Sequence, residues 1–106
     1  MNESKEKLRV AKILASCRTR IDALDDEIIA LLADRTKIIY EAAELKSKEN
    51  IVIIQQDRVE EVKDRNAKMA KRMGISAELV RAIYALIIDE SHIIENRITK
   101  EARRTK

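Results

Sequence analysis

The chain has 106 residues, with 22 basic and 19 acidic side chains and a formal net charge of +3. It contains no Pro, Trp or Phe and a single Gly, so the turn residues that a sheet requires are nearly absent and we expect an all-α fold. Charged residues make up 39% of the chain, which excludes a membrane protein. No signal-peptide pattern opens the chain, so we expect a single cytoplasmic domain over residues 1–106.

The first predicted helix covers residues 5–48, a stretch without Gly or Pro. Apolar side chains repeat there at two positions of a heptad, which we call the seam. The seam residues are Leu14, Cys17, Ile21, Leu24, Ile28, Leu31, Arg35, Ile38, Ala42 and Leu45. A helix of about 40 residues is near 60 Å long. Because so small a chain cannot cover it, we predict an intertwined homodimer.

Cys17 is the only cysteine and cannot form a disulfide within the chain. Since it falls on the seam, we interpret it as a small core residue.

A short second helix is predicted over residues 58–73. Glu49 and Asn50 end the first helix, and residues 51–54 form an apolar connector. Asp57 is predicted as the N-cap, with Glu60 completing a capping box. Gly74 suits the left-handed position that follows the last residue of a helix.

A third helix is predicted over residues 76–103, capped by Ser76. Its apolar face comprises Leu79, Ile83, Leu86, Ile87, Ile94 and Ile98. Five of the last ten residues of the chain, 97–106, are basic and one is acidic. We interpret this as a solvated helix end whose cations suit the helix dipole. No nucleic-acid partner is expected, because no aromatic stacking residues accompany the charge.

Arg35 is the one charged residue among the ten seam positions. A buried guanidinium is costly unless an anion meets it, so we expect Arg35 to bind a ligand. Lys46 lies eleven residues later, pointing within about 20° of Arg35 at about 16 Å along the axis. Arg18 is too far away to share that ligand within one chain. In an antiparallel dimer, however, Arg18 of the partner subunit approaches Arg35 and Lys46, which predicts two equivalent cationic pockets.

Three further polar residues are candidates for the same pocket. Arg58 opens the second helix, and Ser91 and Glu95 lie one turn apart on the third. Several cations with a hydroxyl and a carboxyl suit a small dicarboxylate, because arginine binds carboxylates bidentately. One Cys and one His do not make a metal site, and a Gly-rich phosphate loop is absent from the sequence. We therefore expect neither a metal site nor a phosphate-binding loop of this kind.

The run from Cys17 to Arg35 reads CRTRIDALDDEIIALLADR, and Lys46, Asp57-Arg58 and the segment 86–91 follow it. Together these motifs resemble the all-helical chorismate mutases, whose pattern is R-x-x-I-D-x-[IL]-D followed by L-[IL]-A-E-R. The resemblance covers residues 14–98. It implies three helices per chain in an entwined dimer. It also implies the cofactor-free rearrangement of chorismate to prephenate, a step of phenylalanine and tyrosine biosynthesis.

The resemblance also implies roles for five residues of the predicted pocket. Arg18 of the partner subunit and Arg35 bind the substrate carboxylates. Lys46 bonds a carboxylate and the ether oxygen. Ser91 helps to hold the ring carboxylate. Glu95 stands where many members have Gln, a residue that hydrogen-bonds the ether oxygen.

The start of the second helix departs from the family pattern. Arg58 matches the family arginine, but the next residue, usually a Glu that contacts the ring hydroxyl, is Val59. Gln55 falls where others often have Asp, near the same hydroxyl. The related isochorismate-pyruvate lyases share the fold and have Arg-Val at this point. The substrate is therefore chorismate or, as an alternative, isochorismate or an amino analogue of chorismate.

A non-catalytic helical dimerisation module is the alternative of another class. It is disfavoured because a pure interaction seam gains nothing from Arg35 beyond control of register.

Overall fold

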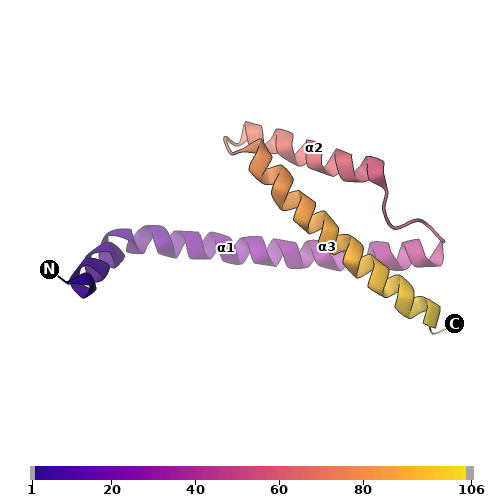
Figure 1. Ribbon diagram of the computed structural model, residues 1–106, viewed down its shortest axis with the longest axis horizontal. Coiled ribbons are helices and arrows are strands. Elements are labelled where there is room, and N and C mark those ends of the chain that lie inside the picture. Colours follow the sequence, from indigo (N-terminus) through magenta and orange to yellow (C-terminus); the bar gives the residue numbers. More distant parts are fainter. Residues whose placement is uncertain (1, 105–106) are drawn as a thin grey trace. The chain divides into compact units, whose positions relative to one another are not determined.

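The computed structural model describes residues 2–104, which form three helices: α1 (Glu3–Lys48), α2 (Gln56–Arg72) and α3 (Ala77–Arg104) (Figure 1). Within this range there is no strand, so the predicted all-α class with one very long helix is confirmed. Thr105 and Lys106, at the end of the basic segment, lie outside the described residues. None of the three helices has an apolar stretch long enough to span a membrane, as judged over residues 2–104.

The end of α1 is formed by Asn50, as predicted. Its φ of 55° is in the left-handed region, which Asn tolerates better than most residues. The Ile51 N–H donates to the Lys46 carbonyl at 2.8 Å and the Asn50 N–H to the Ser47 carbonyl at 3.4 Å. This pair of bonds is a Schellman motif, which satisfies carbonyls of the last turn and turns the chain sharply.

The end of α2 has the same construction. Gly74 has a φ of 77°. The Ile75 N–H donates to the Ala70 carbonyl at 2.9 Å and the Gly74 N–H to the Lys71 carbonyl at 3.2 Å. The predicted role of Gly74 is thus confirmed.

The cap of α3 is also as predicted. The Ser76 hydroxyl accepts from the Leu79 N–H at 3.1 Å, two residues into the helix that begins at Ala77.

The predicted N-cap of α2 is wrong. Gln55, not Asp57, precedes the helix, with extended φ and ψ of −105° and 92°. Asp57 therefore lies inside the first turn, where a carboxylate is still favourable to the helix dipole. The Glu60 carboxylate accepts from the Gln56 amide at 3.1 Å, one turn away, instead of completing a capping box.

The chain divides into two compact units, one ending at Arg35 and the other beginning at Thr36. In the first unit, a single stretch of α1, the leucines and isoleucines of the seam are exposed in the single chain, from 38% at Leu14 to 66% at Leu31. Cys17 is exposed as well, so a core role for it requires a second chain.

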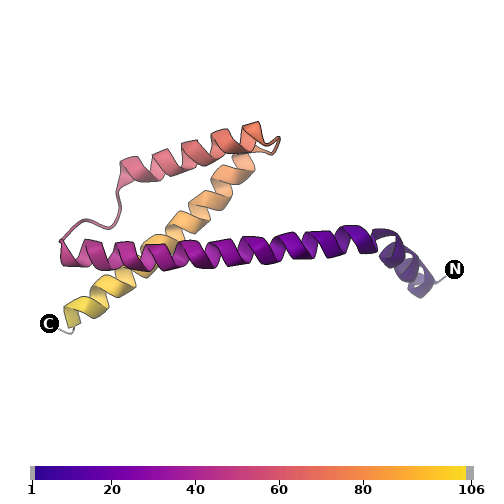
Figure 2. The ribbon, with the colours of Figure 1, turned by 180° about the vertical axis from the view of Figure 1, so that it is seen from behind.

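The second unit comprises the end of α1, the connector, α2 and α3. Helices α2 and α3 pack against each other after the turn that joins them (Figures 1 and 2). The buried apolar side chains are few and small on two of the three helices: Ala43, Ala67, Ala70, Ile88 and Ile94. Of the apolar face predicted for α3, Leu79, Ile83 and Leu86 are exposed in the single chain. The buried apolar core of this unit thus consists of alanines of α1 and α2 and isoleucines of α3.

Candidate active site

Lys46, in the last turn of α1, is the centre of a buried polar contact with α3. Its Nζ donates to Glu95 Oε2 at 2.8 Å and to the Ile53 carbonyl at 2.7 Å. The side chain of Lys46 is 20% exposed and that of Glu95 is 4% exposed. An ion pair so shielded from water is sensitive to the loss of either partner, because the remaining charge is left buried.

Ser91 lies one turn before Glu95 on the same face of α3, and both residues are buried. The Ser91 hydroxyl donates to the Ile87 carbonyl at 3.0 Å. Ile88 and Ile94 are the buried apolar residues of the same segment. The second unit thus brings an ammonium group and a carboxyl group together, with a hydroxyl one turn away on the same buried face.

The residues at the start of α2 are engaged locally. The Gln55 amide donates to the Val52 carbonyl at 2.7 Å, which holds the end of the connector. Arg58 is exposed and forms an ion pair with Glu61 one turn later. Val59 is half-buried. A substrate contact from Arg58 would require its guanidinium to leave Glu61, a small cost for an exposed pair.

Arg18 and Arg35 belong to the first unit. Arg18 is exposed and Arg35 is half-buried in the single chain. Their convergence with Lys46 on one ligand stays a prediction.

Sequence reasoning missed the main-chain partner of Lys46. The Ile53 carbonyl belongs to a connector whose course no local pattern predicts, and a carbonyl is present at every residue. The direct Lys46–Glu95 ion pair was missed too, although both residues were predicted for the site. The burial of Glu95, which makes a paired cation favourable, is known only from the structure.

A cavity of about 480 Å³ lies along the connector on the second unit. It is lined by residues 50–54, by Lys46 and Ser47 of α1, and by Asn96, Thr99, Ala102 and Arg103 of α3. One flank of the connector therefore faces open space instead of packed side chains.

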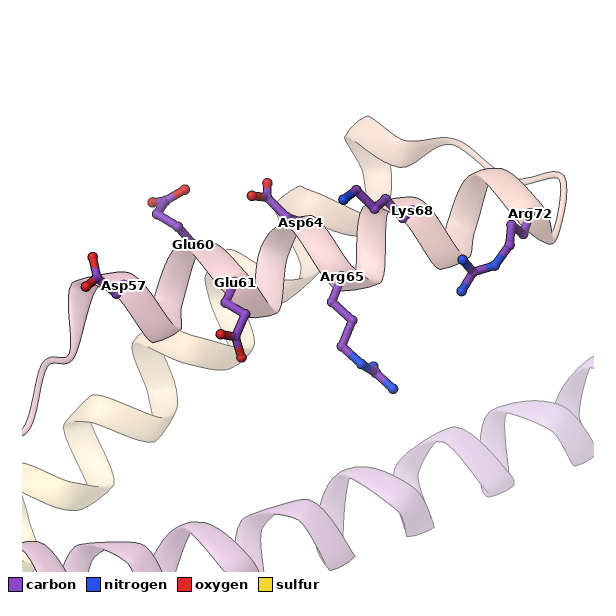
Figure 3. A pocket seen from close by; sticks show the side chains of 7 residues that line it. All are labelled: Asp57, Glu60, Glu61, Asp64, Arg65, Lys68 and Arg72. Carbon is purple, nitrogen blue, oxygen red and sulfur yellow. The ribbon is translucent and has the colours of Figure 1, made fainter.

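A second hollow, of about 580 Å³, runs along α2 alone (Figure 3). Only charged side chains line it: Asp57, Glu60, Glu61, Asp64, Arg65, Lys68 and Arg72. Figure 3 shows the acids toward the start of α2 and the cations toward its end, the order that complements the helix dipole. Its acidic half would repel a dicarboxylate, so we assign it no part in binding one.

Across residues 2–104 there is no group of three His, Cys, Asp or Glu side chains arranged to hold a metal ion. Lys46, Ser91 and Glu95 form hydrogen bonds, and Lys46 and Glu95 also form an ion pair.

Comparison with known proteins bears on this arrangement. Over 90 residues the chain is 26% identical to a chorismate mutase of Methanocaldococcus jannaschii, which covers 85% of this chain and 91% of that protein. It is 28% identical to the T-protein of Enterobacter agglomerans and 25% identical to the bifunctional chorismate mutase/prephenate dehydratase of Escherichia coli. These two matches cover 78% and 83% of this chain but only 22% and 23% of the longer relatives.

The family model described as chorismate mutase type II matches residues 17–96, a range that begins at the seam residue Cys17 and ends just after Glu95. It includes every residue that we predicted for the site. The chain belongs to the chorismate mutase type II family.

Proposed function

We propose that the protein catalyses the rearrangement of chorismate to prephenate at a cofactor-free site centred on Lys46 and Glu95. The observation that carries the proposal is the buried contact of 2.8 Å between Lys46 Nζ and Glu95 Oε2, in a chain of this family. These are the two residues that the resemblance assigns to the ether oxygen, and they meet across 49 residues of sequence.

The reaction makes few chemical demands on the protein. One C–O bond of the ether breaks while a C–C bond forms within the same molecule, so no nucleophile, redox group or external proton is needed. Catalysis then comes from holding the reactive conformer and from stabilising the charge that develops in the transition state. Negative charge grows on the ether oxygen, and the Lys46 ammonium is the group that meets it.

Glu95 assists only in its protonated form. A carboxylate has no hydrogen to donate, whereas a neutral carboxylic acid donates one hydrogen bond. In the single chain the Lys46 ammonium bonds Glu95 at 2.8 Å. Binding of chorismate divides that contact, so that Lys46 and Glu95 both face the ether oxygen of the substrate.

The two substrate carboxylates require further cations. Arg35 and Arg18 of the partner subunit are proposed to bind them bidentately, with Ser91 helping to hold the ring carboxylate. The exposed seam of α1 supports the homodimer that this arrangement needs. Isolated apolar residues on a surface are ordinary, but a continuous apolar stripe that also leaves Leu24, Leu31 and Ile38 more than half exposed is typical of an interface.

Arg58, Gln55 and Val59 are proposed to face the substrate ring from the start of α2. Val59 has no polar atom in its side chain to accept a hydrogen bond from a ring hydroxyl. That single feature favours isochorismate-pyruvate lyase, or an amino-chorismate mutase, as the second candidate function on the same fold.

A product assay decides between these functions. The purified chain is incubated separately with chorismate and with isochorismate, and the products are separated by chromatography. Prephenate from chorismate, with turnover abolished in a Lys46→Ala variant, is the expected result. Pyruvate release from isochorismate without prephenate formation would favour the lyase. A folded chain that turns over neither compound would leave the non-catalytic dimerisation module.

A further inference from the structure

Lys46 is tied to the connector at two points. Its carbonyl accepts from the Ile51 N–H at 2.8 Å, and its ammonium donates to the Ile53 carbonyl at 2.7 Å. The same ammonium bonds Glu95 at 2.8 Å. Two of its three N–H groups are therefore oriented, and one of the two acceptors is main chain of the connector.

Packing does little to hold the connector in the single chain. Ile51, Val52 and Ile54 are 47%, 70% and 55% exposed, and the cavity of about 480 Å³ lies along them. Its course depends on the hydrogen bonds at its two ends: the Schellman bonds around Asn50 and the bond from the Gln55 amide to the Val52 carbonyl.

Asn50 determines the direction in which the connector leaves α1. Its left-handed backbone, with a φ of 55°, reverses the chain after α1 and directs the following residues back along Lys46. Asn accepts this conformation readily, Gly more readily still, and a β-branched residue hardly at all.

We propose that Asn50 is a positioning residue for the rearrangement: by ending α1 in the left-handed conformation it presents the Ile53 carbonyl to Lys46, which holds the ammonium group at Glu95. This inference rests on the proposed function, in which that ammonium meets the ether oxygen. Asn50 itself touches neither Glu95 nor the substrate in this arrangement. Its effect is on where the ammonium lies.

Gly74 provides a matched control within the same chain. It ends α2 with the same two hydrogen bonds and has a φ of 77°. A Cβ at Gly74 would meet no atom of the described chain within 4 Å, so a side chain there adds conformational strain without a clash. Substitution at Gly74 therefore strains an equivalent helix end that forms no bond to Lys46.

The experiment compares Asn50→Val, Asn50→Gly and Gly74→Val in the full chain. Two readouts are needed: kcat for chorismate, and the ammonium signal of Lys46 in a heteronuclear NMR spectrum of the free protein. That signal persists only while hydrogen bonds slow proton exchange, and its absence from a Lys46→Arg variant assigns it. We expect Asn50→Val to lose the signal and at least about 10-fold in kcat, since misplacement of a catalytic group by 1 Å can cost about 100-fold. Asn50→Gly and Gly74→Val should retain both.

Several results would overturn the inference. An Asn50→Val protein with the Lys46 signal intact and the kcat of Gly74→Val would do so, as would equal losses in the two Val variants. A wild-type chain without the signal would also contradict it. If either Val variant fails to fold, Asn50→Ala and Gly74→Ala make the same comparison with less strain. Should the wild type show the signal but no mutase activity, the proposed function fails while the NMR comparison still tests the positioning role.

Discussion

Two regions of the molecule distribute their side chains in opposite ways. Along the first unit, α1 leaves the leucines and isoleucines of its seam in solvent. In the segment 88–95 of α3, a serine and a glutamate are buried beside isoleucines. Burial thus does not follow hydrophobicity in either region, and each exception calls for an explanation. We propose a second chain as the explanation of the exposed seam, and a substrate that divides the buried pair as the explanation of the second region.

Removal of Lys46 tests the buried region most severely. Lys46→Ala leaves the Glu95 carboxylate buried without its cation and removes the charge that we propose to meet the ether oxygen. We expect kcat/KM for chorismate to fall by about 100- to 1,000-fold. Stability should fall by about 3 kcal/mol, the low end for a broken buried pair because Lys46 is 20% exposed. Lys48→Ala, an exposed lysine half a turn away, is the control for initial rates and urea denaturation, and an equal loss there would contradict the assignment.

A charge on the seam tests the exposed region. Leu31→Lys changes a side chain that is already 66% exposed in the single chain. The substitution should therefore have little effect on the stability of a monomer. In the proposed dimer it buries an ammonium in an apolar interface. We expect dissociation in analytical ultracentrifugation and a loss of about 100-fold in activity, since Arg18 of the partner subunit leaves the site.

The matched control for the seam is Ile29→Lys. Ile29 is 64% exposed on the same helix but lies off the heptad seam. It should remain dimeric and active. If both variants behave alike, the seam is not the interface.

Glu95→Gln sharpens the account of the buried pair. The amide donates a hydrogen bond at every pH, whereas Glu95 donates only when protonated. We therefore expect the variant to have at least the kcat of the wild type, whereas Glu95→Ala, which removes the side-chain donor, should be slower than both. The measurement is kcat for chorismate of the three proteins under one set of conditions. A Glu95→Gln protein as slow as Glu95→Ala would rule out a hydrogen bond from this residue to the ether oxygen.

Val59→Glu tests the ring contact and should have the smallest effect. A carboxylate there accepts a hydrogen bond from the ring hydroxyl of chorismate, a gain of about 1 kcal/mol or roughly 5-fold in kcat/KM relative to isochorismate. Val62→Glu, at another half-buried valine of α2, is the control. An unchanged ratio of the two substrates in Val59→Glu would remove Val59 from the site.

Local signals in the sequence predicted the ends of the helices well where the backbone itself decides them. Asn50, Gly74 and Ser76 act through their own φ angles or their own hydroxyl, within four residues. Asp57 was predicted as an N-cap by the same kind of signal and is not one. The end of the connector is fixed instead by Lys46 and Gln55, through carbonyls at Ile53 and Val52. The capping pattern at Asp57 contains no information about Lys46, which bonds the carbonyl of Ile53 seven residues further along the chain.

For the site, chemistry and spacing were predictable and pairing was not. Lys46, Ser91 and Glu95 were predicted from their place on helix faces and from the family motif; Ser91 and Glu95 are buried, and the side chain of Lys46 is 20% exposed. That Lys46 bonds Glu95 directly depends on how α3 lies against the end of α1, which no helix period encodes. Arg18 and Arg35 depend on a second chain, so their part in the site is a matter for the dimer experiment.

The ion pair of Lys46 and Glu95 has a consequence for engineering. Ion pairs shielded from water often contribute little net stability compared with apolar residues of the same volume. A double replacement such as Lys46→Met with Glu95→Leu should then preserve the three-helix architecture while erasing reactivity. Such a chain would be an inert scaffold of known shape, into which new chemistry could be introduced at the end of α1 without first having to rebuild the protein around it.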